Sequence, residues 1–273
     1  MGIKAKQRAS ITLKILFGLV WILPIFLALI FSFYPNINFM RIPLSFVTDR
    51  ITIENYMYVF QNVPIFRYIL NTMIIILICI PCQVILSSSA AYAFSFLNIP
   101  MKETLFSIML AGMMIPGEVT LVANYMTVQR LGLIDTYMGM AVTSLVGAGS
   151  IFLLRQTMLA IPKEMSEAAI MDGCGQFRFY VRFALPLSKS ILSAMMITSF
   201  IDIYNSYFWP LLVTTKEDCR PIQVGMAQLT ADAFSRYGFV LAGAFISMLI
   251  PVVMFFFGQD KIVEGMTAGA VKS

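Results

Sequence analysis

Few residues in this sequence are suited to chemistry, and the most suggestive pair is Cys79 and Cys82. Ile80 and Pro81 separate the two thiols, which is the spacing of a thioredoxin-type redox motif. The pair lies within a long apolar run, where burial disfavours the reactive thiolate. We therefore interpret it as two packed thiols.

The chain contains no histidine. Ser-His-Asp catalysis, Cys-His catalysis and histidine-bound zinc are therefore excluded. Carboxylate, lysine or tyrosine chemistry remains, but the sequence shows no constellation for it. No glycine is followed by lysine, so the phosphate-binding sequence G-x-x-x-x-G-K-[ST] is absent. We expect a protein that is not an enzyme, with no catalytic residue, no metal site, no cofactor and no nucleotide bound to this chain.

Two carboxylates lie inside stretches that are otherwise apolar. Glu118 follows Pro116 and Gly117, and Asp202 precedes Asn205 by three residues. Ionisable groups inside a membrane are costly and often face a solute pathway. Glu118, Asp202 and Asn205 are therefore candidate pathway residues. The alternative is a structural hydrogen bond or access to water near a helix end.

The composition requires lipid as the solvent for much of the surface. Hydrophobic residues make up 59% of the 273 residues and charged residues only 12%. A soluble domain has about 45–50% apolar and about 25% charged residues. The net charge of +5 comes from scattered basic residues, so it does not indicate nucleic-acid binding. We expect an all-α membrane protein.

A helical span needs about 20 mostly apolar residues. Six stretches meet this requirement, at residues 15–40 (with a helix ending near Tyr34-Pro35), 68–101, 104–125, 136–154, 190–215 and 237–259. The first follows a basic segment, as a signal peptide would. Its apolar run is longer than a signal core and no small-residue cleavage site follows, so we expect a retained helix.

The basic residues indicate the orientation of the chain. With the N-terminus inside, 12 Lys and Arg side chains fall on the inner side and 7 on the outer side, which accounts for all 19. The positive-inside rule then places both termini in the cytoplasm. The outer segment 35–67 is long enough for a surface helix near residues 54–60. The inner segment 156–189 is the largest cytoplasmic loop and a natural place for a partner to bind.

That inner loop predicts two short helices. Pro162 suits the first turn of a helix, and Met165, Ala168 and Ala169 follow the spacing of an apolar stripe. Gly173 stands where a helix could end in a left-handed cap. A second helix is expected over residues 176–183, before Leu185-Pro186 turns the chain into the fifth span. The two alanines would form a small, flat face.

The same loop resembles the EAA loop of ABC importer permeases. The resemblance rests on Glu167, Ala168, Ala169, Asp172, Gly173, Leu185 and Pro186. In that MetI-like family the loop docks in a cleft of an ATPase subunit and transmits its closure to the membrane helices. The resemblance therefore implies the type I importer permease fold, with six transmembrane helices and the coupling loop at 161–186.

The stretches QRLGLIDTYMGM, FLLRQTMLAIPKEMSEAA and NSYFWPLL are similar to permeases of the carbohydrate branch, of the maltose and multiple-sugar type. Cys174 stands where alanine is usual, and no tryptophan precedes Asn205. The second departure leaves the substrate class open, because permeases for glycerol phosphate are closely similar. In the maltose-type branch the sugar contacts lie mostly in the partner permease, so the resemblance alone assigns no ligand residue to this chain.

The resemblance implies a division of the chain and a set of partners. The permease core would cover residues 67–258, with residues 1–66 holding the inner tail, the first helix and the outer loop, and 259–273 a cytoplasmic tail. The expected partners are a second homologous permease, two ABC ATPase subunits that bind ATP, an extracytoplasmic solute-binding protein and membrane lipid, with no nucleic acid. The expected location is the bacterial cytoplasmic membrane. The rival is an ion-coupled secondary transporter, but the inverted repeat typical of one is not seen.

Overall fold

The computed structural model describes residues 2–36, 50–233 and 236–268, and every regular element within these ranges is helical. Residues 37–49 of the predicted outer segment and 269–273 of the predicted tail lie outside the described residues. The chain forms two compact units, Met1–Phe66 with Gly225–Leu249 and Arg67–Val224 with Ile250–Ser273. All candidate site residues belong to the second unit.

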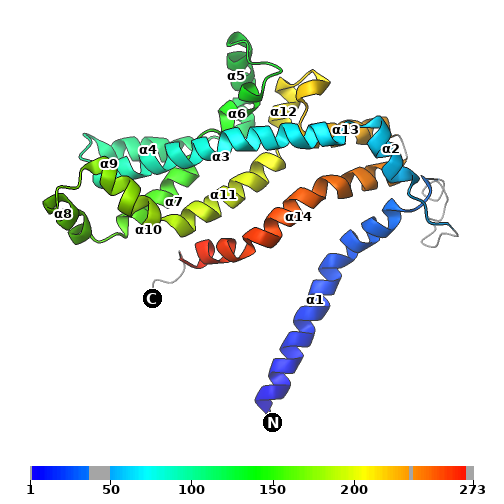
Figure 1. Ribbon diagram of the computed structural model, residues 1–273, viewed down its shortest axis with the longest axis horizontal. Helices are drawn as coiled ribbons and strands as arrows, with labels where there is room; N and C mark the ends of the chain where they lie inside the picture. Colours follow the sequence, from blue (N-terminus) through cyan, green and yellow to red (C-terminus); the bar gives the residue numbers. More distant parts are fainter. Residues whose placement is uncertain (1, 37–49, 234–235, 269–273) are drawn as a thin grey trace. The chain divides into compact units, whose positions relative to one another are not determined.

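Three helices are long and apolar enough to cross a membrane, namely α1 (Gly2–Ser32), α3 (Ile65–Phe96) and α14 (Tyr237–Ala268) (Figure 1). They confirm the first, second and sixth predicted spans. The apolar part of α14, Tyr237–Gln259, coincides with the predicted sixth span. The helix itself continues to Ala268, into the segment predicted as a tail.

The third predicted span, 104–125, is wrong as a single helix. It consists of α4 (Lys102–Gly112) and α5 (Gly117–Arg130), which meet at an angle of 96°. Pro116 adopts an extended conformation with φ −59° and ψ 135°. Proline has no N–H for the helical ladder, and its ring disfavours helix at the residue before it. The chain therefore leaves α4 and restarts in a new direction.

The fourth and fifth predicted spans are also interrupted. The fourth consists of α6 (Tyr137–Ala141), the short helix η2 (Val142–Ser144) and α7 (Ala148–Leu159), with a bend of 47° before α7. The fifth consists of α11 (Lys189–Tyr204) and α12 (Phe208–Val213). A third bent pair joins the helical segment Gln176–Leu187 to α11. If each bent pair of helices counts as one span, the described residues hold up to six spans.

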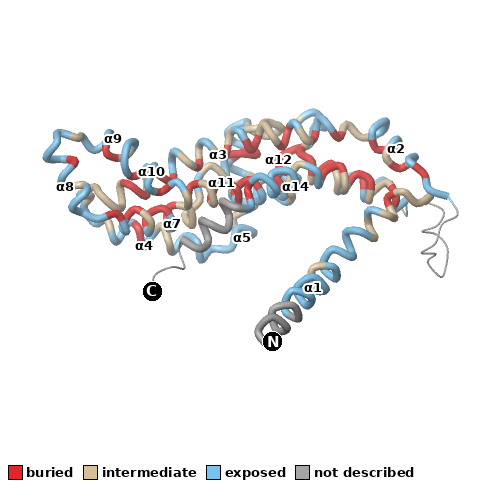
Figure 2. The backbone as a smooth tube through the Cα atoms, turned by 60° about the horizontal axis from the view of Figure 1, so that its bottom comes forward, coloured by how far each residue is buried: buried red, intermediate tan, exposed pale blue. Residues whose placement is uncertain are grey.

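The second unit has two apolar clusters. One joins α3, α4, α7 and α11 to the segment that follows Ala160, and it includes Tyr92, Phe106, Leu154, Met158 and Phe179. The other joins α3 to α5, α6 and α12, and it includes Ile75, Cys79, Val128, Met140, Trp209 and Val213. Buried residues recur at intervals along α3 and α7 (Figure 2). Cys79 is a buried free thiol and Cys82 a half-buried one, as expected for packed cysteines.

The first unit is organised around a buried amide. The surface helix predicted near residues 54–60 is α2 (Glu54–Asn62). Asn55 of this helix donates hydrogen bonds to the carbonyl oxygens of Ser32 (2.7 Å) and Tyr34 (2.9 Å), which lie at the C-terminal end of α1. A side chain on Gly238 would collide with this amide, since a Cβ there would lie 2.5 Å from its nitrogen. The helix α13 (Ile222–Asp232) precedes α14 in the chain.

Candidate functional site

The loop between α7 and α11 begins with a capped helix. Helix α8 (Lys163–Met171) starts after Pro162 and ends at a left-handed glycine, Gly173, with φ +73°. The N–H of Gly173 donates to the carbonyl of Ile170, and that of Cys174 to the carbonyl of Ala169 at 2.8 Å. Both the start of the helix and its glycine cap follow the prediction.

The second helical segment is longer than predicted. It runs through α9 (Gln176–Phe179), the π-helical turn η3 (Tyr180–Ala184) and α10 (Leu185–Leu187). Pro186 cannot donate a hydrogen bond, and just before it the N–H of Leu185 reaches back five residues to the carbonyl of Tyr180. Leu185 and Pro186 therefore stay helical. The chain turns by 74° at Ser188 instead.

The structure separates the two alanines of the motif. Ala169 is only 7% exposed and belongs to the apolar cluster with Phe179 and Ala184. Ala168 is exposed, as are Glu167 and Asp172. The predicted flat face made of both alanines is therefore incorrect, because Ala169 packs against its own chain.

Two exposed apolar side chains of this loop were not identified from the sequence. Met171 is 87% exposed and Phe177 is 77% exposed. Their spacing around Gly173 and Gly175 carries no periodic signal, so only the folded loop reveals them. Both side chains are therefore accessible to a partner protein. Helix α8 lies at one end of the second unit (Figure 1).

The inner side of the loop is bonded to α3. The hydroxyl of Tyr92 donates to the backbone carbonyl of Gln176 at 3.0 Å. The hydroxyls of Ser88 and Tyr180 are hydrogen-bonded at 2.6 Å. The rings of Tyr92 and Tyr180 are in contact, with centroids 5.1 Å apart. The loop and α3 are therefore connected by hydrogen bonds and by a contact between aromatic rings.

A buried arginine supports the base of the loop. Arg155 of α7 is 7% exposed and donates to Glu103 Oε1 at 2.6 Å and to the carbonyl of Phe94 at 3.3 Å. Its guanidinium also lies 3.9 Å from the ring centre of Phe106. Arg155 thus links α7 to the C-terminal part of α3 and the N-terminal part of α4. From the sequence alone, Arg155 was only one of the 12 basic residues predicted on the cytoplasmic side.

The three candidate pathway residues are not gathered at one site. Glu118 is exposed and lines a groove of about 420 Å³ between α5 and the break that separates α11 from α12. Asp202 on the last turn of α11 and Asn205 just after the helix are exposed and do not line that groove. Asn205 Oδ1 accepts a hydrogen bond from Gln223 Nε2 at 3.3 Å. Of the three residues, Glu118 is the one that lines this groove.

Residues 45–259 match the family model described as the inner membrane component of binding-protein-dependent transport systems. The chain belongs to this family. It is therefore a multi-pass membrane protein and a transport permease. The loop described above carries the residues that resemble an EAA loop, and we refer to it by that name.

Relatives of this permease are named for two kinds of substrate. The chain is 27% identical to the arabinooligosaccharides transport system permease protein AraQ of Bacillus subtilis, over 97% of this chain and 96% of the relative. It is 29% identical to the sn-glycerol-3-phosphate transport system permease protein UgpE of Rhizobium meliloti, over 93% of this chain and 94% of the relative.

The fold of the permease matches a solved importer. The matching chain comes from the crystal structure of a bacterial ABC transporter involved in the import of the acidic polysaccharide alginate. The TM-score is 0.80 at 20% identity, over 94% of this chain and 96% of the solved one. This likeness establishes the ABC importer permease fold.

At the end of α3 opposite the EAA loop, the permease has a polar network. The carboxylate of Asp135 accepts hydrogen bonds from the backbone N–H groups of Thr215 (2.6 Å) and Lys216 (2.8 Å) and from the Thr215 hydroxyl (2.6 Å). Partial burial opposes ionisation of Asp135, but these donors outweigh it and lower its pKa. Asn71 of α3 donates to the carbonyls of Asp218 and Arg220, both at 2.9 Å. The loop that follows α12 is therefore held in one conformation.

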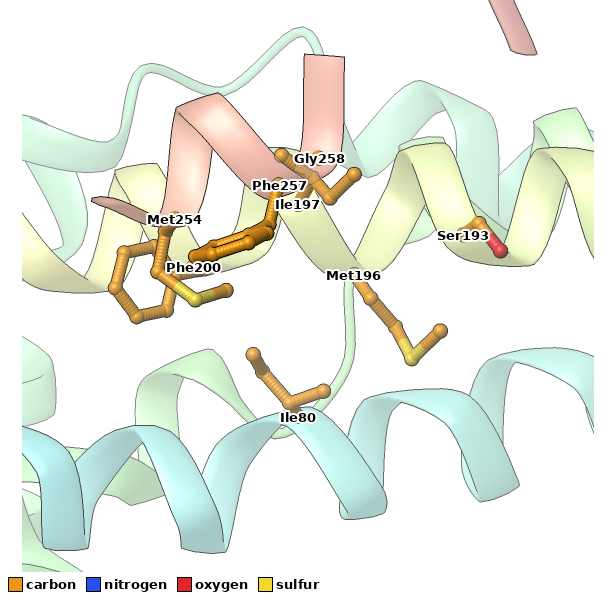
Figure 3. Close-up of a pocket in the computed structure, with 8 residues that line it drawn as sticks. All are labelled: Ile80, Ser193, Met196, Ile197, Phe200, Met254, Phe257 and Gly258. Atoms are coloured by element: carbon orange, nitrogen blue, oxygen red, sulfur yellow. The ribbon is translucent and has the colours of Figure 1, made fainter. Parts of the chain in front are cut away.

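A second groove of the permease is almost entirely apolar. It has a volume of about 320 Å³ and lies between α3, α11 and α14. Ile80, Met196, Phe200 and Phe257 converge on it (Figure 3). No ionisable side chain lies among the described residues that line it, and none of the predicted pathway residues is present.

Proposed function

We propose that this permease is one membrane subunit of an ATP-driven importer that moves carbohydrate across the bacterial cytoplasmic membrane by alternating access. Its partners are a second homologous permease, two ABC ATPase subunits and an extracytoplasmic binding protein. The family description supports dependence on a binding protein. The arabinooligosaccharide-named relative, which aligns over nearly the whole chain, supports a carbohydrate substrate.

The observation that carries the proposal is the two-sided EAA loop. Its outer side presents Glu167, Ala168, Met171 and Phe177 to a partner, and its inner side buries Ala169 in the membrane-domain core. A partner that binds the outer side can therefore shift α3 and α7 through the loop, without contacting those helices itself. An ATPase subunit is the partner that the resemblance to ABC importers implies.

The chain itself supplies no catalytic step in this proposal. ATP binding closes the two ATPase subunits, which pull on the EAA loops of the two permeases. The permease pair then opens outward, receives the solute, and returns inward after hydrolysis. Both termini of this chain lie in the cytoplasm, as the distribution of basic residues indicates.

One alternative substrate has a specific observation in its favour. The glycerol-3-phosphate-named relative is as similar as the arabinooligosaccharide-named one. Both alternatives describe an importer with the same subunits, and they differ in the charge of the transported solute.

The energy source provides the test. We expect proteoliposomes that contain the complete complex to take up a radiolabelled neutral trisaccharide when ATP is supplied on the ATPase side. Uptake should persist when ionophores collapse the ion gradients. Uptake that follows an ion gradient and ignores ATP would identify a secondary transporter and contradict the proposal. The purified chain alone should show no saturable ATP binding, because it lacks a phosphate-binding loop.

The orientation is tested with single cysteines. In a chain whose four native cysteines are replaced, Lys216→Cys and Arg178→Cys place one thiol at an exposed position in each predicted compartment. In spheroplasts, a membrane-impermeant maleimide should label Lys216→Cys and leave Arg178→Cys unlabelled. Opening the membrane in the absence of the ATPase should expose Arg178→Cys. Labelling of Arg178→Cys from outside would reverse the topology.

A further inference from the structure

We propose that the groove between α5 and the α11–α12 break is a binding subsite for one uncharged sugar unit. This inference rests on the proposed import of carbohydrate. It goes further in giving this chain a direct contact with the solute, and in specifying that the solute is uncharged.

The groove has the size and lining of a small-molecule site. Its volume of about 420 Å³ falls within the range of about 300–1,000 Å³ that ligand pockets occupy. Such pockets combine aromatic walls with a few polar groups. Here the aromatic side comes from the start of α12 and the polar side from α5, and the residues are Tyr207, Phe208, Trp209, Glu118, Thr120 and Asn124.

The groove lies where two helices are interrupted. The break of 96° between α4 and α5 precedes Gly117, and the break after α11 precedes Phe208. Helix α12 packs on α5 and α6 in the second unit (Figure 1). In a membrane, irregular backbone is tolerated only where it is buried in protein or lines a water-filled cavity. Transporters build substrate sites from such broken helices.

The groove is anchored inside the span, not at its end. Trp209 and Val128 pack with Ile75 and Cys79, and Cys79 lies near the middle of α3. The indole N–H of Trp209 donates to the carbonyl of Gly139 at 3.2 Å, and only 8% of the residue is exposed. Trp209, one side chain of the aromatic wall, is therefore held in place by the protein itself.

The polar wall has groups that remain available for hydroxyl groups. The Thr120 hydroxyl is used, since it donates to the carbonyl of Gly117 at 2.8 Å. Asn124 makes one long contact, 3.4 Å from its Nδ2 to Thr120 Oγ1, and its amide oxygen faces no donor among the described residues. No hydrogen bond or ion pair within the described part of the chain engages the carboxylate of Glu118. A sugar hydroxyl can donate to each of these two oxygens.

The charge of the groove lining distinguishes between the candidate solutes. Glu118 is the one charged side chain among the described residues that line the groove, and neither lysine nor arginine is present there. A phosphate or a uronate carboxylate in this groove would meet a like charge with no cation to balance it. Like charges repel more strongly away from bulk water. The lining therefore favours a neutral sugar over glycerol phosphate or an acidic oligosaccharide.

Photo-crosslinking in the complete complex tests the subsite. The photoreactive residue p-benzoyl-phenylalanine replaces Phe208, which is 70% exposed, or, as a control, Leu211, which is on the same helix and outside the groove. The probes are tritiated arabinotriose, xylotriose and maltotriose, with glycerol 3-phosphate and an alginate trisaccharide as anions. We expect the neutral trisaccharide that the complex imports to label position 208 at least tenfold more than position 211. The anions should label neither.

The outcomes separate the subsite from the function. ATP-dependent uptake of a neutral trisaccharide with equal labelling at the two positions would overturn the subsite and leave the proposed function standing. Preferential labelling by an anion would overturn the charge argument. If no carbohydrate is taken up, the proposed function fails and the subsite fails with it.

Substitutions in the polar and aromatic walls give a second readout. Asn124→Ala and Tyr207→Ala should each lower the maximal rate of trisaccharide uptake at least tenfold. Tyr207→Phe and the control Leu211→Ala should stay within twofold of the parent. Glu118→Gln should raise labelling of position 208 by the alginate trisaccharide at least threefold, because it removes the repelling charge. Unchanged uptake in both Asn124→Ala and Tyr207→Ala would overturn the subsite.

Discussion

A permease carrying Gly173→Asp is expected to insert into the membrane normally and to lose at least nine-tenths of its uptake activity. Gly173 closes α8 at φ +73°, where a side chain costs roughly 1 kcal/mol or more. An added carboxylate also faces the negative end of the α8 dipole, which costs about 0.3–1 kcal/mol. Together these effects amount to roughly 2 kcal/mol, or about a thirtyfold loss of the capped conformation.

The structural change that causes the loss of uptake would be confined to the loop. A Cβ built on Gly173 meets nothing within 4 Å, so the substitution creates no clash with the core. Membrane insertion and co-purification of the second permease should therefore be unchanged. Co-purification of the ATPase and solute-stimulated ATP hydrolysis should both fall.

Gly175 offers a matched control. It lies two residues away, precedes α9 with φ −68°, and also has nothing within 4 Å of a built Cβ. Aspartate is a favourable residue before a helix. Gly175→Asp adds the same charge to the same exposed loop and should retain most of the uptake. Equal losses in the two variants would show that charge on the loop, and not the glycine cap, governs coupling.

Arg155→Ala is expected to produce the largest loss of stability. The substitution removes the buried guanidinium that joins the carbonyl of Phe94, the carboxylate of Glu103 and the ring of Phe106. Breaking a buried ion pair costs about 3–5 kcal/mol. Glu103 is exposed, with 71% of its side chain accessible, so the substitution leaves no charge buried. The cost should therefore lie below that range, at about 1.5–3 kcal/mol for the lost hydrogen bonds of the charged group.

The expected measurement is a fall of the midpoint of thermal unfolding in detergent, with loss of ATPase co-purification at temperatures where the parent complex is intact. Arg130→Ala is the control, since Arg130 is exposed at the end of α5. Glu103→Gln should be mild, because the amide can still accept from Arg155. If Arg155→Ala unfolds at the same temperature as Arg130→Ala, the buried arginine does not support the loop.

Hydropathy and single-residue signals predicted the elements that depend on local sequence. The spans within α1, α3 and α14 are uninterrupted apolar runs, and the cap at Gly173 follows from a glycine placed after an apolar stripe. The sequence also carried the family assignment, because the EAA loop combines residue types and spacing that rarely occur together.

The breaks in the remaining spans were not predicted, because hydropathy averages over a window that includes them. The sequence shows Pro116 just before Glu118, but an angle of 96° depends on how α5 packs against α12. The same limit applies to the site. Ala168 and Ala169 are identical residues next to each other, and only the packing of Phe179 and Ala184 decides which one is covered. Glu118 and Asp202 looked equivalent until the bends of their helices placed one of them in a groove.

The shortness of α4 affects how this protein must be made. Its 11 residues extend about 16 Å, roughly half of the 30 Å hydrocarbon core. Helix α4 alone therefore cannot complete a span, and the bend of 96° before α5 leaves irregular backbone at Pro116 that the protein must cover. Helix α12 packs on α5 and lies far behind it in the sequence. The packing around α5 is therefore complete only when a later part of the chain has been synthesised.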